Sequence, residues 1–433
     1  MNFFEKIEQK SIQVAVVGGG YVGLPLAVEI CRVGISVTVL DNNAEKVASL
    51  MDGVSYIGDV SSDSLKEILK KDLFRATTDS SFLAEADAVV ICVPTPLRKT
   101  KDPDVSFIMD AAEHLSEHLH EGQVVILEST TYPGFTREML QTRLEQTGLK
   151  VGENFFLGFS PERVDPGNEK YGTRNTPKVI GGATEECLKR VEALYSEFID
   201  NLVSVSSTDA AEMVKLLENT FRAVNIGLVN EVAIMCHKLG LDTWEVIDAA
   251  ATKPFGFMRF YPGPGLGGHC IPIDPHYLSW KLKTLEYNAR FIELAGEVNS
   301  SMPMVVVERV VDALNEHKKA VNGARILVLG VAYKKNIDDV RESPALDIMD
   351  VLSRKGAHIS FHDPFVPALR VPSGGDLSSV PFDDLGSYDC VVIVTDHDIS
   401  DYKRLMNEAK IVVDTRNATA GFRNDGKAQV VTL

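Results

Sequence analysis

The sequence predicts an α/β protein in which two doubly wound domains are joined by a long helical connector. Its first half alternates short Val- and Ile-rich runs with helix-like stretches, the pattern of a parallel sheet covered by helices. Residues 207–239 then form one long stretch with few helix breakers. After Gly323 the alternation returns. These observations predict domains over residues 1–205, 206–318 and 319–433.

The first domain is expected to contain buried strands separated by helices. The apolar runs show no two-residue alternation, as expected for strands covered on both faces. The predicted strands are Val14–Gly18, Val37–Leu40, Ala88–Val93, Val124–Glu128 and Phe155–Phe159. The predicted helices include Pro25–Val33, Asp63–Lys70 and Phe107–Leu119.

The connector is predicted to hold two long helical blocks and one loop. The blocks cover residues 207–239 and 289–317, and Pro303 marks a kink or a fresh start in the second. Between them, residues 255–275 are crowded with Gly and Pro and form a segment long enough to be a functional loop.

The last domain repeats the pattern of short apolar runs seen in the first. Its predicted strands are Arg325–Leu329, His358–His362, Cys390–Thr395 and Ile411–Asp414. Residues 369–385 are expected to form a looser surface insertion.

Composition limits the classes of function. The 433 residues carry 44 basic and 61 acidic side chains, a net charge of −17, which argues against a nucleic-acid-binding surface. No apolar run is long enough to span a membrane. The N-terminal segment has two Glu and no apolar core, so it is not a signal peptide, and a cytoplasmic location is expected.

Three glycines, Gly18, Gly20 and Gly23, form a G-x-G-x-x-G pattern between a predicted strand and a predicted helix. This is the Rossmann pattern for a dinucleotide pyrophosphate. Because the alternation of strands and helices returns in the last domain, we expect two Rossmann-like doubly wound domains. Asp41 follows Gly23 at 18 residues, close to the spacing of an acid that binds the ribose, and its charge favours NAD over NADP. The alternative is a glycine turn needed only for packing, with Asp41 as a helix cap.

The six cysteines are far apart and form no CxxC pair, so free thiols are expected. Five of them lie in apolar patterns. Cys270 instead lies in the sequence Gly267-Gly268-His269-Cys270 of the Gly/Pro loop. Because glycines allow a ligand to approach closely, Cys270 is a candidate nucleophile.

Other polar residues allow two interpretations. Lys215 and Asn219 share one helix face, either as a solvated surface or as a partly desolvated oxyanion site. Glu162 follows a predicted strand and is either a general base or a surface partner of Arg163. The residues around His269 match no zinc spacing, so no metal site is expected.

At this point the chain resembles the UDP-glucose/GDP-mannose dehydrogenase family, over residues 13–417. The markers appear in order as VVGGGYVGLPLA, CVPTP, ESTTYPG, SPERVDPGN, AEMVKLLEN, YPGPGLGGHCIPIDP, GVAYKKNIDDVRESP and DTRN. SPERVDPGN and GGHCIPIDP are most similar to the branch that oxidises UDP-N-acetylhexosamines, with UDP-N-acetylglucosamine 6-dehydrogenases the nearest match. UDP-N-acetylmannosamine, UDP-N-acetylgalactosamine and UDP-glucose remain alternative substrates.

The resemblance implies a four-electron oxidation of the sugar C6 alcohol to a carboxylate, with two NAD molecules used in turn, in the synthesis of surface polysaccharide precursors. Cys270 would carry the thiohemiacetal and thioester, and Glu162 would direct water onto the thioester. The residues with implied catalytic roles are Cys270, Glu162, Lys215, Asn219, Asp274 and Thr131.

The resemblance also implies ligand contacts and an assembly. NAD contacts are implied for Gly18, Gly20, Tyr21, Val22, Gly23, Asp41, Lys46, Thr95, Thr130 and Arg341. UDP-sugar contacts are implied for Glu162, Arg163, Lys215, Asn219, Arg259, Tyr261, Gly267, Tyr333, Lys334 and Arg416. The family places an arginine matching Arg259 in the partner's site, which implies a homodimer or a higher homo-oligomer.

Two positions depart from the UDP-glucose enzymes of the family. Pro166 stands where they carry a second Glu that contacts the cofactor, and His269 stands where they carry Ser. Both changes accompany the N-acetylhexosamine branch. Two rival functions stay open: a two-electron hydroxyacid dehydrogenase, which needs no cysteine, and a non-catalytic NAD-binding protein.

Overall fold

The computed structural model describes the chain except for residues 99–101, 165–167, 169, 269–270, 372–373 and 425. The described residues form two compact units. Unit 1 comprises Met1–Glu218 and His276–Tyr287, and unit 2 comprises Asn219–Pro275 and Asn288–Leu433. Helix α8 (Thr208–Leu239) begins in unit 1 and ends in unit 2.

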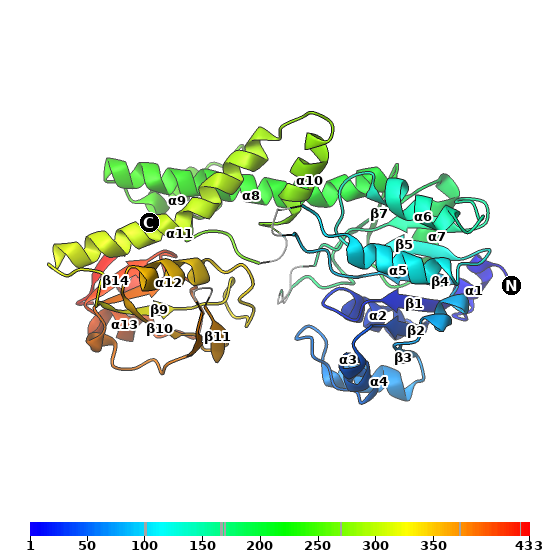
Figure 1. The fold of residues 1–433 in the computed structure, drawn as a ribbon, viewed down its shortest axis with the longest axis horizontal. Coiled ribbons are helices and arrows are strands. Elements are labelled where there is room, and N and C mark those ends of the chain that lie inside the picture. Colours follow the sequence, from blue (N-terminus) through cyan, green and yellow to red (C-terminus); the bar gives the residue numbers. More distant parts are fainter. Residues whose placement is uncertain (99–101, 165–167, 169, 269–270, 372–373, 425) are drawn as a thin grey trace. The chain divides into compact units, whose positions relative to one another are not determined.

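In its described residues, unit 1 contains an eight-stranded sheet in the order β3-β2-β1-β4-β5-β6-β7-β8 (Figure 1). Strands β1 to β6 are parallel, in the order that Rossmann folds use. Strand β7 runs antiparallel to β6, and β8 runs parallel to β7. The strands are β1 Gln13–Val17, β2 Ser36–Leu40, β3 Phe74–Thr77, β4 Ala88–Ile91, β5 Val124–Leu127, β6 Phe156–Phe159, β7 Lys178–Gly182 and β8 Leu202–Val205.

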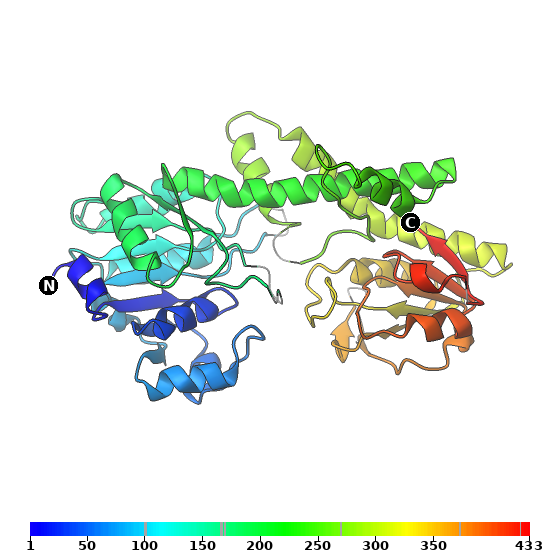
Figure 2. The same ribbon diagram turned by 180° about the vertical axis from the view of Figure 1, so that it is seen from behind.

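Helices lie on both faces of this sheet, as Figures 1 and 2 show from opposite sides. On one face α2 and α7 share a core with alternate residues of the strands, including Val14, Val16 and Val90. The intervening residues, such as Ala15 and Val89, are buried as well. The helices are α1 Phe3–Glu8, α2 Gly23–Arg32, α3 Ala44–Met51, α4 Ser62–Lys70, α5 Ser106–Ser116, α6 Thr142–Glu145 and α7 Glu185–Tyr195.

The predicted strands of unit 1 match β1, β2, β4, β5 and β6 to within two residues at each end. Strands β3, β7 and β8 were not expected. Each lacks a continuous apolar run: β3 carries an exposed Arg75, β7 begins with Lys178 and ends in two glycines, and β8 exposes Val203 and Ser204.

Unit 2 contains, in its described part, a five-stranded parallel sheet in the order β10-β9-β13-β14-β15. The strands are β9 Arg325–Leu329, β10 His358–His362, β13 Cys390–Ile393, β14 Ile411–Asp414 and β15 Gln429–Thr432. The four predicted strands are confirmed, and β15 is additional. The segment expected as a loose insertion holds a short antiparallel hairpin, β11 Ala368–Arg370 and β12 Asp376–Ser378.

The helices of unit 2 cover both faces of its sheet. Residues of α11 and α12 share one core with β9 and β13, and residues of α13 share another on the opposite face. These helices and their neighbours are α9 Thr243–Ala250, α10 Asp274–Lys283 (which continues into unit 1), α11 Arg290–Glu316, α12 Pro344–Arg354 and α13 Tyr402–Glu408. A fresh start at Pro303 is wrong, because α11 continues through it as one helix.

Within unit 2, α8 and α11 approach closely because Gly227 has no side chain. A Cβ atom on Gly227 would lie 3.2 Å from the backbone of Ala295. Asn230 and Asn299 join the two helices through a buried hydrogen bond of 2.8 Å, and Asn230 also accepts the amide of Gly263 from the Gly/Pro loop. Among the residues described, no helix is both long and apolar enough to cross a membrane.

Candidate active site

The three glycines of the first turn play three different structural roles. Gly18 has φ of +100°, and a Cβ there would lie 2.7 Å from the carbonyl oxygen of Cys92. A Cβ on Gly23 would lie 2.0 Å from the Gly18 oxygen, so strand and helix could not pack as they do. Gly20 has nothing within 4 Å of its Cβ position, which leaves room for a ligand to reach the backbone.

The start of α2 is suited to bind an anion. Its N-cap residue, Val22, makes no side-chain cap. The Leu24 amide donates to the Gly20 carbonyl and Pro25 has no amide hydrogen, so the amides that precede Leu24 are the ones suited to bind an anion. The positive end of the helix dipole adds to their attraction for phosphate. Tyr21 beside it is 54% exposed. The glycine turn and the start of α2 fit a dinucleotide pyrophosphate. Packing alone does not require the glycine at position 20.

Asp41 lies directly after β2, beside the glycine turn. Its carboxylate accepts the amides of Gly19 and Asn43, both at 2.9 Å. Tyr56, which the sequence analysis missed, donates its hydroxyl to the Gly19 oxygen at 2.6 Å, and the Lys46 ammonium lies 5.5 Å from the Tyr56 ring centre. Burial and the charge of Asp41 raise the pKa of Tyr56 to about 12, so it remains a neutral donor.

Thr95, Thr130 and Thr131 follow the neighbouring strands β4 and β5. The Thr95 carbonyl accepts the hydroxyl of Tyr277 at 2.8 Å. The Thr131 hydroxyl donates to the buried carboxylate of Glu212 at 3.2 Å. The family resemblance implies roles for these three threonines, but the sequence gives no signal for their hydrogen-bonding partners.

Glu212 is a second residue that the sequence analysis missed. Besides Thr131, it accepts the amide of Gly134 at 2.6 Å and both the amide and the hydroxyl of Thr136 at 2.9 and 2.6 Å. Burial raises its pKa to about 7, although these hydrogen bonds oppose the shift. Glu212 therefore fixes the loop after β5 to the start of α8.

Glu162 lies just beyond β6, with its side chain 12% exposed. One carboxylate oxygen accepts the amides of Arg163 (2.8 Å) and Val164 (2.6 Å), and the other lies 3.4 Å from the Lys178 ammonium. The interpretation of Glu162 as a surface partner of Arg163 is wrong, because the Arg163 guanidinium pairs with Glu218 at 2.6 Å.

The charges around Glu162 keep it ionised. Burial by itself raises the pKa of a carboxyl group, but the charge of Lys178 and the amide of Val164 outweigh it, so the pKa of Glu162 is lowered. The charge of Lys215 contributes in the same direction. Lys215 is only 8% exposed, which excludes the solvated interpretation of its helix face.

In unit 2, Asn219 and Asp274 lie together. The Asn219 amide donates to the Asp274 carboxylate at 2.6 Å, and Asp274, the first residue of α10, is 3% exposed. Both were predicted site residues. Cys270, the predicted nucleophile, and the adjacent His269 lie outside the described residues. The other five cysteines are buried, as expected.

The Gly/Pro loop packs against predicted UDP-sugar residues of unit 2. A Cβ on Gly267 would lie 2.6 Å from the Cβ of Tyr333, and one on Gly263 would lie 2.4 Å from the guanidinium of Arg416. Arg416 donates to the Val394 carbonyl at 2.9 Å, and burial lowers its pKa. Gly267 therefore neighbours Tyr333, and Gly263 neighbours Arg416.

The remaining predicted ligand residues of unit 2 are more exposed. Arg259 donates to Asp248 (3.1 Å) and Tyr261 (3.0 Å) in an exposed cluster. Arg341 is paired with Asp339 at 2.6 Å, and Lys334 is half-buried in the same loop. In the described part of the chain, no group of three His, Cys, Asp or Glu residues could hold a metal ion.

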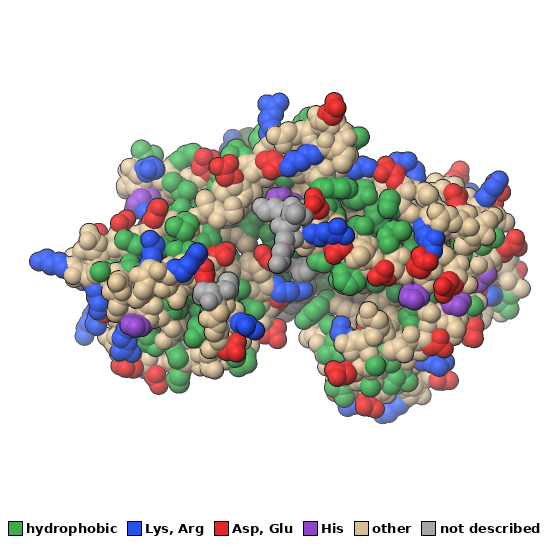
Figure 3. Space-filling model, in the orientation of Figure 1, with side chains coloured by type: hydrophobic (Ala, Val, Ile, Leu, Met, Phe, Trp, Pro, Cys, Tyr) green, Lys and Arg blue, Asp and Glu red, His purple; other side chains and the backbone are tan. Residues whose placement is uncertain are grey.

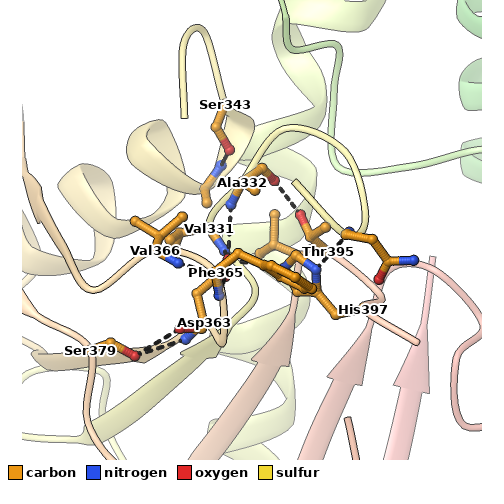
Figure 4. A network of polar contacts seen from close by, with 12 residues as sticks. Val331, Ala332, Ser343, Asp363, Phe365, Val366, Ser379, Thr395 and His397 are labelled. Atoms are coloured by element: carbon orange, nitrogen blue, oxygen red, sulfur yellow. Dashed lines mark hydrogen bonds and ion pairs between the residues drawn. The ribbon is translucent and has the colours of Figure 1, made fainter. Parts of the chain in front are cut away.

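A buried network joins the loops after three strands of the second sheet (Figure 4). The Asp363 carboxylate, after β10, accepts the amides of Val331 (2.7 Å) and Ala332 (3.1 Å), which follow β9. The carboxylate also accepts a hydrogen bond from His397 Nε2 at 3.0 Å. The other ring nitrogen, His397 Nδ1, accepts a hydrogen bond from the Asn336 amide at 2.9 Å. Asp363 and His397 were not predicted, yet they fix the loop that carries Tyr333 and Lys334.

Comparison with known protein families gives matches to three segments of the chain. Models of the UDP-glucose/GDP-mannose dehydrogenase family match residues 12–199 with the NAD binding domain, 209–301 with the central domain and 327–421 with the UDP binding domain.

Two curated relatives and one solved structure match nearly the whole chain. The UDP-N-acetyl-D-glucosamine 6-dehydrogenase of Pseudomonas aeruginosa is 36% identical and covers 92% of both chains. The UDP-N-acetyl-D-mannosamine dehydrogenase of Pyrococcus horikoshii is 34% identical, covering 94% of this chain and 96% of that protein. The solved UDP-D-ManNAc dehydrogenase from Pyrococcus horikoshii has a TM-score of 0.88 and 32% identity, covering 97% and 99% of the two chains.

The open space at Gly20 leads to a first prediction. Gly20→Ala should fold normally, because its Cβ meets no protein atom, but should weaken NAD binding about tenfold or more by obstructing the pyrophosphate. Calorimetric titration with NAD measures the affinity. Gly172→Ala, which is equally open, is the control. Unchanged NAD affinity in Gly20→Ala would mean that the phosphates bind elsewhere.

The Asp363 network leads to a second prediction. Its hydrogen bonds outweigh burial and lower the pKa of Asp363, so the carboxylate stabilises the fold above the unfolded pKa of about 4 and loses that effect as pH falls. Asp363→Asn should therefore lower the free energy of unfolding by about 2–4 kcal/mol at pH 7. The deficit relative to the unsubstituted protein should shrink between pH 5 and pH 3.5. Urea unfolding, with the exposed Asp376→Asn as control, measures it; a deficit independent of pH would contradict this role.

Proposed function

This chain belongs to the UDP-glucose/GDP-mannose dehydrogenase family, as an NAD-dependent nucleotide-sugar dehydrogenase, and we propose that it oxidises C6 of a UDP-N-acetylhexosamine to the carboxylate. UDP-N-acetylglucosamine is the substrate we favour. The observation that carries the proposal is the buried, ionised Glu162 at the end of β6, in the same sheet whose first turn is open for NAD. Synthesis of surface polysaccharide precursors is the role that we infer.

The proposed reaction converts one alcohol, two NAD⁺ and one water into a carboxylate, two NADH and three protons. NAD supplies the hydride acceptor in both oxidations. Cys270 adds to the C6 aldehyde to give a thiohemiacetal, and loss of the second hydride leaves a thioester. Because the intermediate is covalently held, the aldehyde does not escape before the second oxidation.

Glu162 is proposed to remove a proton from the water that attacks the thioester. A lowered pKa supports this role, because the carboxylate is then ready to accept a proton at neutral pH. Lys215 and Asn219 are proposed to stabilise the oxyanion, with Asp274 orienting Asn219. The Thr131 hydroxyl donates its hydrogen bond to Glu212. We therefore propose that the Thr131 oxygen accepts a hydrogen bond from water or substrate.

The ligand residues divide between the units. We propose that NAD is held by the turn Gly18–Gly23, Asp41, Lys46, Thr95 and Thr130, with Arg341 completing the set. We propose that the UDP-sugar is held by Arg163, Tyr333, Lys334, Arg416 and the loop at Gly267, with Arg259 and Tyr261 supplied across a subunit interface. The net charge of −17 does not oppose this, because acidic and basic side chains are interspersed on the face in Figure 3. The three-domain division at residues 205 and 318 is retained as a proposal.

A homodimer or a higher homo-oligomer is proposed because α8 exposes an apolar stripe. Phe221, Leu228, Met235 and Leu239 are 45–71% exposed and recur at intervals of seven and four residues, hence on one side of the helix. The other side packs on α11 at Gly227. An exposed apolar surface of this kind is typical of an interface between subunits.

The stripe leads to a prediction about assembly. Leu228→Glu should shift the protein toward the monomer mass in light scattering coupled to gel filtration, because it places a charge at the centre of the stripe. Lys355→Glu, which reverses an exposed charge outside α8 at the end of α12, is the control and should leave the mass unchanged. A monomer in the unsubstituted protein would overturn the proposal.

The reaction itself is tested by counting NADH. A panel of UDP-GlcNAc, UDP-ManNAc, UDP-GalNAc and UDP-glucose is supplied in limiting amounts with excess NAD. We expect two NADH for each UDP-GlcNAc consumed and an acidic product. A ratio of one would instead indicate a two-electron dehydrogenase, and turnover of another sugar alone would change the substrate assignment.

The cysteine is tested separately. Cys270→Ala should lower carboxylate formation by at least about a thousandfold while NAD and UDP still bind, because the covalent intermediate cannot form. Cys31→Ala is the matched control, since burial raises the pKa of that thiol to about 12 and keeps it unreactive. Carboxylate formation at the unsubstituted rate in Cys270→Ala would remove the thioester from the mechanism.

A further inference from the structure

Unit 1 buries a charged cluster behind Glu162 that the proposed reaction does not use. Lys178 is 4% exposed, and its ammonium forms ion pairs with Glu128 and, at 3.4 Å, with Glu162. The second oxygen of Glu128 accepts the hydroxyl of the fully buried Tyr195 at 2.6 Å. One ammonium thus lies between two carboxylates.

The direction of β7 explains why Lys178 is there. Strand β7 is antiparallel to β6, with Gly181 paired to Phe159, so the first residue of β7 lies at the edge where β6 ends. Glu128 ends the neighbouring strand β5 at that same edge. In a parallel β7, Lys178 would lie at the opposite edge of the sheet, far from Glu162.

We propose that Lys178 is a positioning residue that orients the Glu162 carboxylate and keeps it in the basic form, with Glu128 and Tyr195 holding Lys178 in place. The proposal rests on the proposed role of Glu162 in thioester hydrolysis. Two backbone amides hold one oxygen of the Glu162 carboxylate. The Lys178 ammonium at the other oxygen therefore sets the rotation of the carboxylate that the amides leave open. Only 5% of the Lys178 side chain is exposed, so we assign it a supporting role and no direct part in the reaction.

The groups facing Glu162 come from several surrounding elements. Lys178 from β7 and Lys215 from α8 favour its ionised form through their charge, and the Glu128 carboxyl group from β5 favours it as a hydrogen-bonding partner. The thiol of Cys92, after β4, is neutral because burial raises its pKa well above the ordinary value. Glu128 has its own pKa raised to about 7, chiefly by burial, so the two carboxyl groups are separated in acidity as acid–base pairs commonly are.

The proposal predicts unequal effects from two substitutions. Lys178→Met removes the positive charge and should move the acidic limb of the kcat profile upward by about one pH unit or more. That shift lowers the rate about tenfold at pH values below both midpoints. Glu128→Gln keeps a hydrogen-bonding side chain and leaves the Lys178 ammonium beside Glu162, so it should move the same limb much less than Lys178→Met does.

The experiment measures kcat against pH from 4 to 9 for UDP-GlcNAc oxidation, together with the intact mass of protein stopped during turnover. Lys178→Met should also accumulate the covalent sugar adduct at the acidic end of this range, because hydrolysis becomes the slow step. Lys178→Arg should restore most of the pH profile, and Tyr195→Phe, which contacts Glu128 but not Glu162, should leave the limb within about 0.3 pH unit.

Distinct outcomes separate the possible failures. If Lys178→Met fails to fold because Glu128 is left unpaired, the double variant Lys178→Met/Glu128→Gln removes both charges and carries the test. Equal loss of rate at every pH in both single variants would reduce the cluster to a structural role and overturn the proposal. If the unsubstituted protein oxidises no UDP-sugar, the proposed function fails instead.

Discussion

The organisation of unit 1 depends on burying one ammonium group at the edge of its sheet. An unpaired buried ammonium destabilises a fold by several kcal/mol, so Lys178 requires acidic partners. Glu128 and Glu162 supply them from two strands, and the reversed direction of β7 brings the lysine to their edge. The direction of β7, the position of the loop that carries Glu162 and the ionisation of Glu162 therefore all depend on these ion pairs.

The same edge carries the NAD turn, and there the backbone provides the ligands. Gly18 and Gly23 are required by the packing of strand on helix, whereas Gly20 is not, since its surroundings are open. The contrast separates two glycines that packing requires from one that it does not require, and the latter is the one we propose to face NAD. Asp41 is held by two amides beside the turn, so its charge is oriented before any ribose arrives.

In unit 2, the buried carboxylate of Asp363 organises the loops at one edge of the sheet. Asp363 gathers amides from the loop after β9 and the imidazole of His397, and in this way it fixes loops from three adjacent strands. Tyr333 in one of these loops then supports the Gly/Pro segment, where side chains on Gly267 or Gly268 would collide with it. In both units, a buried carboxylate organises the edge at which ligand residues collect.

The sequence by itself determined the α/β class, nine strand positions to within two residues at each end, the glycine turn with Asp41, and the family. These features depend on local apolar runs and on motifs whose residues are adjacent in the chain. Only the tertiary structure decided that Lys178, Glu128, Glu212, Asp363 and His397 matter, and that Glu162 pairs with Lys178 instead of Arg163. Their partners lie 16 to 81 residues away in the chain, and no local pattern records which distant charges share one edge of a sheet.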